Sequence, residues 1–341
     1  MPTSPSPLAD ARPVDATSSA RVVVLTTGGT IAGAATHSDD HSGYVAGALN
    51  AAELLRAVPP LADLPLETEA VGAIDSKDMG PGLWRPLVMR LAHHLARQDV
   101  AGVVVTHGTD TLEETVWLLQ RVLSPGKPVI MVAAMRPSTA LSADGPQNLL
   151  DAVRAARTPA LAGVHACIGG RIWAAQDVHK RHSYQVDAFG AVDASPVAMV
   201  VEGQVVPAAV PCGEAAARAR GPAFDADIVQ RPWPWVALLT SHADARPEAV
   251  RAWVSAGLQG LVVAGTGAGT VHAAWQAPLA EAQAAGVAVA LATRCAAGPV
   301  LARPDPQWRV YAGLSAVKAR VELTLELMAG DDGRASAQAS A

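Results

Sequence analysis

The stretch VVVLTTGGTIAG, residues 22–33, decides how the rest of the chain is interpreted. Its apolar start is typical of a strand buried on both faces of a parallel sheet. The two glycines that follow allow a tight turn and leave backbone N–H groups unblocked. We therefore expect a rigid strand that ends in a corner, where N–H groups can hold an anion and Thr30 presents its hydroxyl.

Similar apolar runs, each leading into a helical pattern, recur along the chain. They lie at 100–123 (VAGVVVTHGTDTLEETVWLLQRVL) and 127–139 (KPVIMVAAMRPST), and helical spacing of Leu, Val and Ala marks 86–98 and 145–157. Strands that alternate with helices imply right-handed crossovers. The sequence thus predicts an α/β fold with a doubly wound, mostly parallel sheet, and ligands of such a sheet bind at the carboxyl ends of its strands.

The pattern divides the chain into two domains. A large N-terminal domain is expected at 21–205, a linker rich in Pro, Ala and Gly at 206–231, and a smaller α/β domain at 232–330, where strands and helices alternate again. The end segments 1–20 and 331–341 are expected to be disordered, because they carry too few apolar residues to form a core.

Composition excludes several classes of protein. The chain has 341 residues, half of them apolar, and a net charge of −5, which argues against a duplex nucleic acid partner. No apolar run reaches the roughly 18 residues that span a bilayer. The N-terminus lacks the basic start and apolar core of a secretory signal, so we expect a cytoplasmic protein, or a periplasmic one if a leader is missing.

The cysteines and histidines give no sign of a metal site. Cys167, Cys212 and Cys295 match neither a metal spacing nor a disulfide framework, and we expect all three to be small buried residues. The histidines show no zinc spacing either. His93 and His94 are adjacent, so they point to different sides of their helix and are expected to be structural.

Two residues are candidates for a nucleophile and a base, although each also has a plainer interpretation. Thr30 is a nucleophile if a nearby group removes its proton, but its position alone fits a helix N-cap better. Lys180 is a base if burial lowers its pKa, yet it stands in a loop where a solvated lysine is commoner. The GTGAGT stretch at 265–270 lacks the Lys-Ser/Thr of a Walker loop and is interpreted as a tight corner.

The stretch THGTDTLEET closes the second strand and also allows two interpretations. Asp110 with Glu113, or Thr111 with Glu114, has the spacing of a helix capping box. Alternatively, the Asp110 carboxylate receives a substrate ammonium while Thr109 supplies a second hydroxyl.

Six motifs follow one another along the chain: TTGGTIAG at 26–33, YVAG at 44–47, DSKDM at 75–79, THGTDTLEET at 106–115, MVAAMRPSTALSADGPQNL at 131–149 and DVHK at 177–180. In this order they closely resemble the bacterial-type L-asparaginase family, from about Val22 to Arg320. That family hydrolyses the side-chain amide of asparagine, sometimes of glutamine, with two α/β domains. The resemblance implies a homotetramer built from two tight dimers, and an activity that needs no metal or nucleotide cofactor.

The resemblance assigns catalytic roles to residues of this chain. Thr30 corresponds to the primary nucleophile, and Tyr44, on a mobile loop, to the group that helps to deprotonate it. Thr109, Asp110 and Lys180 correspond to a second triad. These roles suit acyl transfer, which needs a hydroxyl, a proton acceptor and an oxyanion-binding site.

The resemblance also implies how an amino-acid zwitterion is bound. Ser76 holds the α-carboxylate and Asp110 the α-ammonium, while Gly29 and the backbone of Ala134 complete the pocket around the amide. Lys77 stands where the family often has glutamine, and its charge and reach differ from those of an amide.

In many members of this family a neighbouring subunit completes the site. The positions that match its asparagine and glutamate are Thr270 and Asp305, and the corner before Thr270 reads Gly-Ala-Gly where the family often has Gly-Asn-Gly. These departures leave the core chemistry intact and bear on substrate preference.

We therefore expect an L-asparaginase that acts on the free amino acid in asparagine catabolism. A dual asparaginase-glutaminase is the nearest alternative. A subunit that deamidates a glutaminyl substrate for transfer RNA charging would need an extra domain and a partner. An amino-acid-binding protein without activity is the alternative of another class, although a binder has no need for both threonine hydroxyls together with Lys180.

Overall fold

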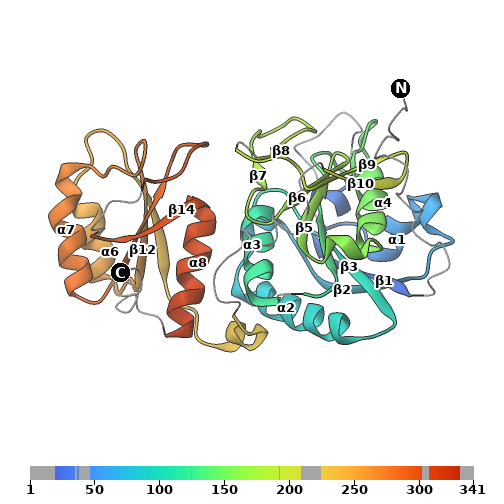
Figure 1. Ribbon diagram of the computed structural model, residues 1–341, viewed down its shortest axis with the longest axis horizontal. Helices are drawn as coiled ribbons and strands as arrows, with labels where there is room; N and C mark the ends of the chain where they lie inside the picture. Colours follow the sequence, from blue (N-terminus) through green and yellow to red (C-terminus); the bar gives the residue numbers. More distant parts are fainter. Residues whose placement is uncertain are drawn as a thin grey trace, which may run out of the picture.

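The computed structural model describes residues 20–34, 37, 47–123, 125–191, 193–208, 224–301 and 307–330. Figure 1 shows two units side by side, each a β-sheet covered by helices, with helix α8 (Ala316–Ala329) between them. Residues 1–19 of the predicted tail 1–20, the predicted tail 331–341 and residues 209–223 of the predicted linker lie outside the described residues. The domain boundaries at 205 and 232 therefore stay predictions.

Within the described residues, eight strands form the larger sheet in the order β10-β9-β6-β5-β4-β3-β1-β2. The strands from β1 to β5 run parallel, and β6, β9 and β10 continue the sheet in antiparallel pairs. The prediction of a doubly wound, mostly parallel sheet is confirmed. The strands are β1 (Arg21–Gly28), β2 (Leu66–Ile74), β3 (Val100–Thr106), β4 (Pro128–Val132), β5 (Gly163–Ile168), β6 (Arg171–Ala174), β9 (Ala198–Val201) and β10 (Gln204–Pro207).

Helices cover both faces of this sheet, which explains the unbroken apolar runs. On β1, Val23 and Leu25 belong to the core beneath α2 and α3, whereas Val22 and Val24 belong to the core beneath α1 and α4. Burial of each such side chain contributes about 1.5–3 kcal/mol to stability. The helices are α1 (Ala51–Arg56), α2 (Pro81–Ala96), α3 (Leu112–Leu123) and α4 (Gly145–Ala156).

The smaller sheet consists of four parallel strands in the described part of the chain, in the order β11-β12-β13-β14. Helix α8 is apolar on two sides: Leu323 packs on this sheet, and Leu325 packs into the core of the larger domain. The two domains therefore share α8 as a common layer. The remaining elements are β11 (Val236–Thr240), β12 (Gly260–Gly265), β13 (Ala288–Thr293), β14 (Arg309–Ser315), α6 (Glu248–Ser255) and α7 (Ala273–Ala284).

Two details differ from the sequence-based expectations. Helix α2 begins at Pro81 rather than at Pro86, because Pro81 occupies its first turn, where a missing N–H costs nothing. Cys167 is buried as expected, but Cys295 is exposed, since the chain leaves β13 there and turns outward. Cys212 lies outside the described residues.

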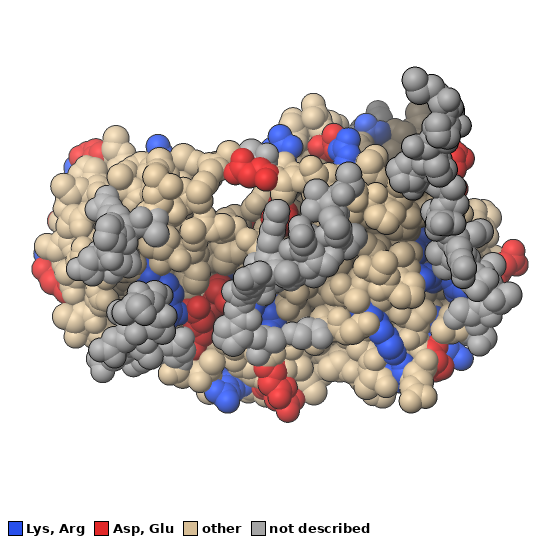
Figure 2. All heavy atoms as spheres, in the orientation of Figure 1, with Lys and Arg blue, Asp and Glu red and all other residues tan. Residues whose placement is uncertain are grey.

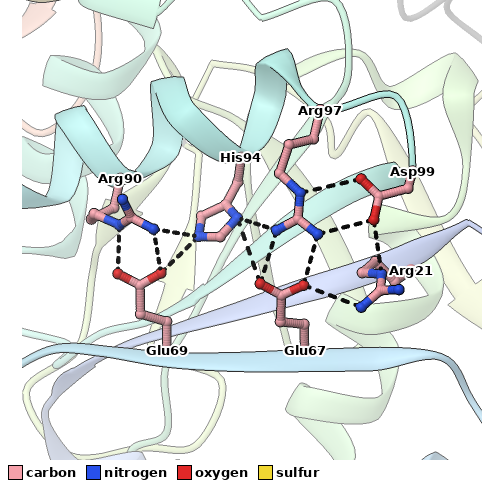
Figure 3. A network of polar contacts seen from close by, with 7 residues as sticks. All are labelled: Arg21, Glu67, Glu69, Arg90, His94, Arg97 and Asp99. Carbon is pink, nitrogen blue, oxygen red and sulfur yellow. Dashed lines mark hydrogen bonds and ion pairs between the residues drawn. The ribbon is translucent and has the colours of Figure 1, made fainter.

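Charged residues tie the edge strand β2 to α2. Figure 3 shows Glu67 and Glu69 of β2 pointing at the helix, where Arg97 and Arg90 each bind one carboxylate through two nitrogen atoms. His94 lies between them with 1% of its area exposed, and its Nε2 is 2.7 Å from Glu69 Oε2. His93 is exposed, so the prediction that the two histidines face different sides is confirmed. Covering an edge strand with charges also hinders pairing with another chain.

The surface is mixed in charge. On the face that Figure 2 shows, lysine and arginine side chains lie in small separate groups among acidic and uncharged ones. Among the described helices, none combines the length and the apolar character needed to cross a bilayer. The part of the chain that the structure describes also brings no three His, Cys, Asp or Glu side chains together as metal ligands.

Candidate active site

Most of the sequence-predicted site residues that the structure describes lie near the carboxyl ends of β1 and β3. These strands are neighbours, yet β2 extends the sheet on one side and β4 on the other, so strand order reverses between them. In a doubly wound sheet, this reversal opens a crevice at the carboxyl ends of the two strands. Three segments meet there: the corner after β1, the turn after β2 and the loop after β3.

The corner after β1 is shaped by two glycines. Gly28 and Gly29 have φ angles of 104° and 83°, which a residue with a side chain rarely adopts. A Cβ atom on Gly29 would lie only 2.3 Å from the backbone nitrogen of Gly108. Gly29 and Gly108 are therefore in close contact, and the residues that follow them, Thr30 and Thr109, lie at the same edge of the sheet.

Thr30 is the first residue of a short 3-10 helix, η1 (Thr30–Ala32), and has 5% of its area exposed. Gly29 occupies the N-cap position of that turn, so the alternative in which Thr30 is the cap is wrong. The Gly29 N–H is also not available to a ligand, contrary to the expectation of unblocked N–H groups, because it donates to the Ile74 carbonyl at 3.0 Å.

Ser76 joins the turn after β2 to the loop after β3. Its Oγ accepts the Asp110 N–H at 3.2 Å, and its carbonyl accepts the Thr111 hydroxyl at 2.7 Å. A Cβ atom on Gly108 would lie 2.4 Å from Ser76 Oγ, so the two segments are in close contact. These contacts fix the direction in which Thr109 and Asp110 leave the sheet.

Lys180 reaches this loop from the two-residue strand β7 (His179–Lys180). Its Nζ donates to Thr109 Oγ1 at 2.8 Å and to Asp110 Oδ1 at 2.5 Å. The Lys180 side chain is 18% exposed, whereas that of Asp110 is 54% exposed. The alternative of a solvated lysine is therefore wrong, and the site combines a buried hydroxyl, an amine and a carboxylate that faces solvent.

Ala134 follows β4 and is fully buried. Asp144 and Asn148 of the next segment hold the loop that carries it. Asp144 accepts the N–H groups of Met135 and Arg136, each at 3.0 Å, and Asn148 Nδ2 donates to the Ala133 carbonyl at 3.0 Å. Sequence reasoning did not single out these two supporting side chains, although both lie within the MVAAMRPSTALSADGPQNL motif.

Lys77 lies at the rim. Its side chain is 61% exposed, and its Nζ is 2.6 Å from Asp75 Oδ2 and 3.4 Å from Asp78 Oδ2. The hydrogen bond with Asp75 raises the pKa of Lys77, so the ammonium is charged and already paired.

The remaining predicted residues are not part of this cluster in the chain. Thr270 lies on the smaller domain, where its hydroxyl donates to the Thr266 carbonyl at 2.9 Å. Tyr44 and Asp305 lie outside the described residues.

His107, just before the loop, is a supporting residue that sequence reasoning missed. It is fully buried, and burial lowers its pKa to about 4, so its ring is neutral. Its Nδ1 donates to the Gly108 carbonyl at 2.7 Å, and its Nε2 accepts the Thr115 hydroxyl at 3.0 Å. Trp84 Nε1 donates in turn to Thr115 Oγ1 at 3.0 Å. These hydrogen bonds connect the loop after β3 to helices α3 and α2.

Glu113 and Glu114, the glutamates of the two alternative capping boxes, contact other segments. Glu113 accepts hydrogen bonds from His179 and Ser315, and Glu114 pairs with Arg320 of α8. Both carboxylates thus join α3 to segments outside its own first turn.

A cleft of about 930 Å³ opens between the two domains. It is bordered by β7, by the loop after β13 and by the start of α8, and Figure 2 shows an opening at this boundary. Among the described residues predicted for the site, Lys180 lines this cleft, whereas Thr30, Thr109 and Thr270 do not.

Comparison with known proteins covers both domains. The family model described as "Asparaginase, N-terminal" matches residues 21–210, and "Glutaminase/Asparaginase C-terminal domain" matches residues 235–339. The "L-asparaginase 2" of Escherichia coli (strain K12) is 34% identical over 90% of this chain and 88% of that protein. The "Glutaminase-asparaginase" of Pseudomonas fluorescens biotype A is 33% identical over 92% and 88%. A crystal structure described as "Probable Cytoplasmic L-asparaginase from Campylobacter jejuni" superposes with a TM-score of 0.82, at 36% identity, over 90% of this chain and 95% of that one.

Proposed function

This chain belongs to the asparaginase family, and on that premise we propose that it is an amidohydrolase that converts L-asparagine to L-aspartate and ammonia, with Thr30 as the nucleophile. The observation that carries the proposal is the contact of Lys180 Nζ with both Thr109 Oγ1 and Asp110 Oδ1. An ion pair with Asp110 alone does not require the Thr109 hydroxyl, whereas a proton relay needs contact between the amine and a hydroxyl.

The reaction proceeds in two steps through a covalent intermediate. In the first step, the Thr30 hydroxyl oxygen bonds to the amide carbon, the C–N bond breaks, and ammonia leaves with the hydroxyl proton. Tyr44 helps to remove that proton. In the second step, water adds to the acyl-threonine, which restores the Thr30 hydroxyl and releases aspartate. The triad of Thr109, Lys180 and Asp110 accepts and returns protons in these steps.

The substrate lies with its charged groups toward groups of opposite character. Ser76 and Lys77 face the α-carboxylate, Asp110 faces the α-ammonium, and the Ala134 backbone lies against the amide. Gly29 keeps the pocket narrow, because its lack of a side chain permits close contact with the loop after β3.

The enzyme acts as a homotetramer in which a neighbouring subunit contributes Thr270 and Asp305 to the site. The open edge supports this arrangement, since Asp110 and Lys77 are half or more exposed in the single chain. Size-exclusion chromatography with light scattering tests the assembly, and a fully active monomer would contradict it. We also propose a cytoplasmic location, as the name of the Campylobacter jejuni protein suggests for that relative, and cell fractionation tests it.

A dual asparaginase-glutaminase is the second candidate function. The observation that favours it is the similarity to a protein named "Glutaminase-asparaginase". Rates of ammonia release from L-asparagine and L-glutamine, measured side by side, decide between a selective and a dual enzyme.

Ammonia release by the purified protein tests the main proposal. We expect Thr30→Ala to lose at least about 1,000-fold in kcat, because no other group forms the acyl intermediate. Thr158→Ala is a matched control, since the Thr158 hydroxyl donates to the Arg154 carbonyl at 3.1 Å, after helix α4 and away from the site. Binding of asparagine without turnover by the wild type would instead indicate a protein that only binds the amino acid.

A further inference from the structure

Lys180 lies on a weakly supported segment. Strand β7 has two residues and pairs only with β8 (Phe189–Gly190), in a ribbon separate from both large sheets of the described chain. The other site residues leave strands of the main sheet directly. The position of Lys180 Nζ therefore depends on whatever holds the backbone of residues 176–180.

The residue that holds this backbone most directly is a lysine on the shared helix α8. Lys318 is 0% exposed, and its Nζ donates to the Gln176 carbonyl at 2.7 Å and to the Val178 carbonyl at 2.6 Å. Burial lowers the pKa of Lys318 to about 8. A buried ammonium with two backbone carbonyls as partners has no substrate to bind, so it serves the segment it contacts.

Glu113 of α3 contacts the same segment. Its Oε2 accepts His179 Nδ1 at 3.0 Å and the Ser315 hydroxyl at 3.1 Å, and its Oε1 accepts the Lys180 N–H at 3.4 Å. Burial would raise the pKa of Glu113, but the hydrogen bond from His179 and the charge of Lys318 lower it below its usual value. The carboxylate is thus ionised and joins α3, β7 and the N-cap of α8.

We propose that Glu113 and Lys318 are positioning residues that hold the 176–180 backbone so that Lys180 Nζ reaches the Thr109 hydroxyl. Glu113 belongs to the larger domain and Lys318 to the helix shared by both domains, so the smaller domain takes part in catalysis within its own chain. This inference rests on the proposed function for its kinetic consequence, and on geometry alone for the placement of Lys180.

An ion pair between the same two helices provides the matched control. Arg320 Nη2 is 2.9 Å from Glu114 Oε2, and these residues lie one and two positions from Glu113 and Lys318. This pair joins α3 directly to α8, and within the described residues it has no hydrogen bond to residues 176–180. We call Glu114 and Arg320 the outer pair, and Glu113 and Lys318 the inner residues. Substitutions in the outer pair weaken the contact between α3 and α8 but leave the hydrogen bonds to β7 in place.

The experiment compares Lys318→Met and Glu113→Gln with Arg320→Met and Glu114→Gln. A displacement of a catalytic group by about 1 Å lowers a rate by about 100-fold. We expect kcat to fall by about 10- to 100-fold in the inner variants, with KM within about threefold of wild type, because the Asp110 backbone stays bonded to Ser76 when Lys180 moves. The outer variants should keep kcat within about twofold. Equal losses in both pairs, or a loss confined to KM, would overturn the proposal.

A crystal structure of an inner variant tests the placement independently of activity. We expect the distance from Lys180 Nζ to Thr109 Oγ1, 2.8 Å in the wild type, to lengthen beyond hydrogen-bonding range. An unchanged distance would overturn the inference even if activity fell. If Lys318→Met fails to fold, Glu113→Gln against Glu114→Gln gives the same comparison. A wild type that releases ammonia from neither amide would refute the proposed function, and the distance would still decide the positioning role.

Discussion

The parallel strands of the larger sheet and those of the smaller sheet both lead into glycine-threonine corners, which look alike in sequence and differ in chemistry. After β3, the Thr109 hydroxyl meets an amine from a segment 71 residues away, at 2.8 Å. After β12, in GTGAGT, the Thr270 hydroxyl donates to the Thr266 carbonyl, and the hydroxyl of Thr293, the last residue of β13, donates to the Gly267 carbonyl of the same corner at 2.7 Å. These hydroxyls of the smaller domain are thus engaged with backbone carbonyls of the corner after β12.

This difference teaches that a glycine-threonine corner specifies a shape rather than a reaction. Both corners place hydroxyls at the carboxyl ends of parallel strands, as the doubly wound arrangement requires. Chemistry arises only where a distant segment delivers a charged partner. In this chain β7 does so for the larger domain, and the following predictions test whether that partner is what separates the two corners.

The strongest test removes the partner itself. Lys180→Met keeps most of the side-chain volume but cannot accept or donate a proton, so we expect kcat to fall by about 1,000-fold or more. Lys127→Met is the control, because Lys127 Nζ donates to the Arg97 carbonyl at the opposite end of the sheet. Ammonia release measures both. Residual activity within about tenfold of wild type would mean that Lys180 is not needed for proton transfer.

A second test separates binding from chemistry within the larger domain. Asp110→Asn preserves shape and removes the charge that we propose faces the substrate ammonium. A hydrogen bond to a charged group is worth about 1.5–3 kcal/mol, so kcat/KM should fall by roughly 10- to 100-fold or more, with a higher KM from the lost ammonium contact and a lower kcat from the lost pairing with Lys180. Steady-state kinetics over a wide range of asparagine concentrations measure the split. An unchanged KM would show that Asp110 does not bind the ammonium.

A third test examines the corner of the smaller domain. If Thr270 of a neighbouring subunit contacts the substrate, it does so with a hydroxyl that already has a partner. Thr270→Ala should therefore raise KM by only about fivefold, within the range of one neutral hydrogen bond, and leave kcat unchanged. A loss of kcat as large as that of Lys180→Met would place chemistry in the smaller domain and end the contrast between the corners.

Much of this architecture is predictable because it rests on local patterns. The run from Val22 to Leu25 must be buried on both faces, and the glycines after it can only form a tight corner. Thr30 and Thr109 follow directly from such strand ends. Thr30 and Thr109 are close because β1 and β3 are neighbouring parallel strands, whose carboxyl ends lie at the same edge of the sheet.

The supporting residues could not be predicted, because their roles depend on contacts distant in sequence. Lys318 sits in a helix whose apolar residues face two domains, so no periodicity marks it as buried. The pKa of His107 is lowered because the fold encloses its ring. Lys180 was assigned through resemblance to a family, as its two-residue strand carries no pattern of its own.

The opposite end of the larger sheet supplies the last and smallest test, because its charges should matter for stability and not for activity. Hydrogen bonds from Arg97 and Arg90 lower the pKa values of Glu67 and Glu69 below 4.5. These carboxylates bind fewer protons in the folded state than in the unfolded state, so their contribution to the free energy of unfolding is fully present above pH 4.5 and is lost as the pH falls below it.

Urea unfolding at pH 6 and pH 3.5 measures this loss. Between the two pH values, the free energy of unfolding should fall less for Glu69→Gln than for wild type. Glu281→Gln, which removes an exposed pair with Arg251, should lose as much free energy of unfolding as wild type. Both variants should keep kcat at neutral pH within about twofold. A Glu69→Gln protein with reduced kcat and unaltered pH dependence of unfolding would show that the edge network acts on the catalytic end of the sheet, and the separation between the two ends would fail.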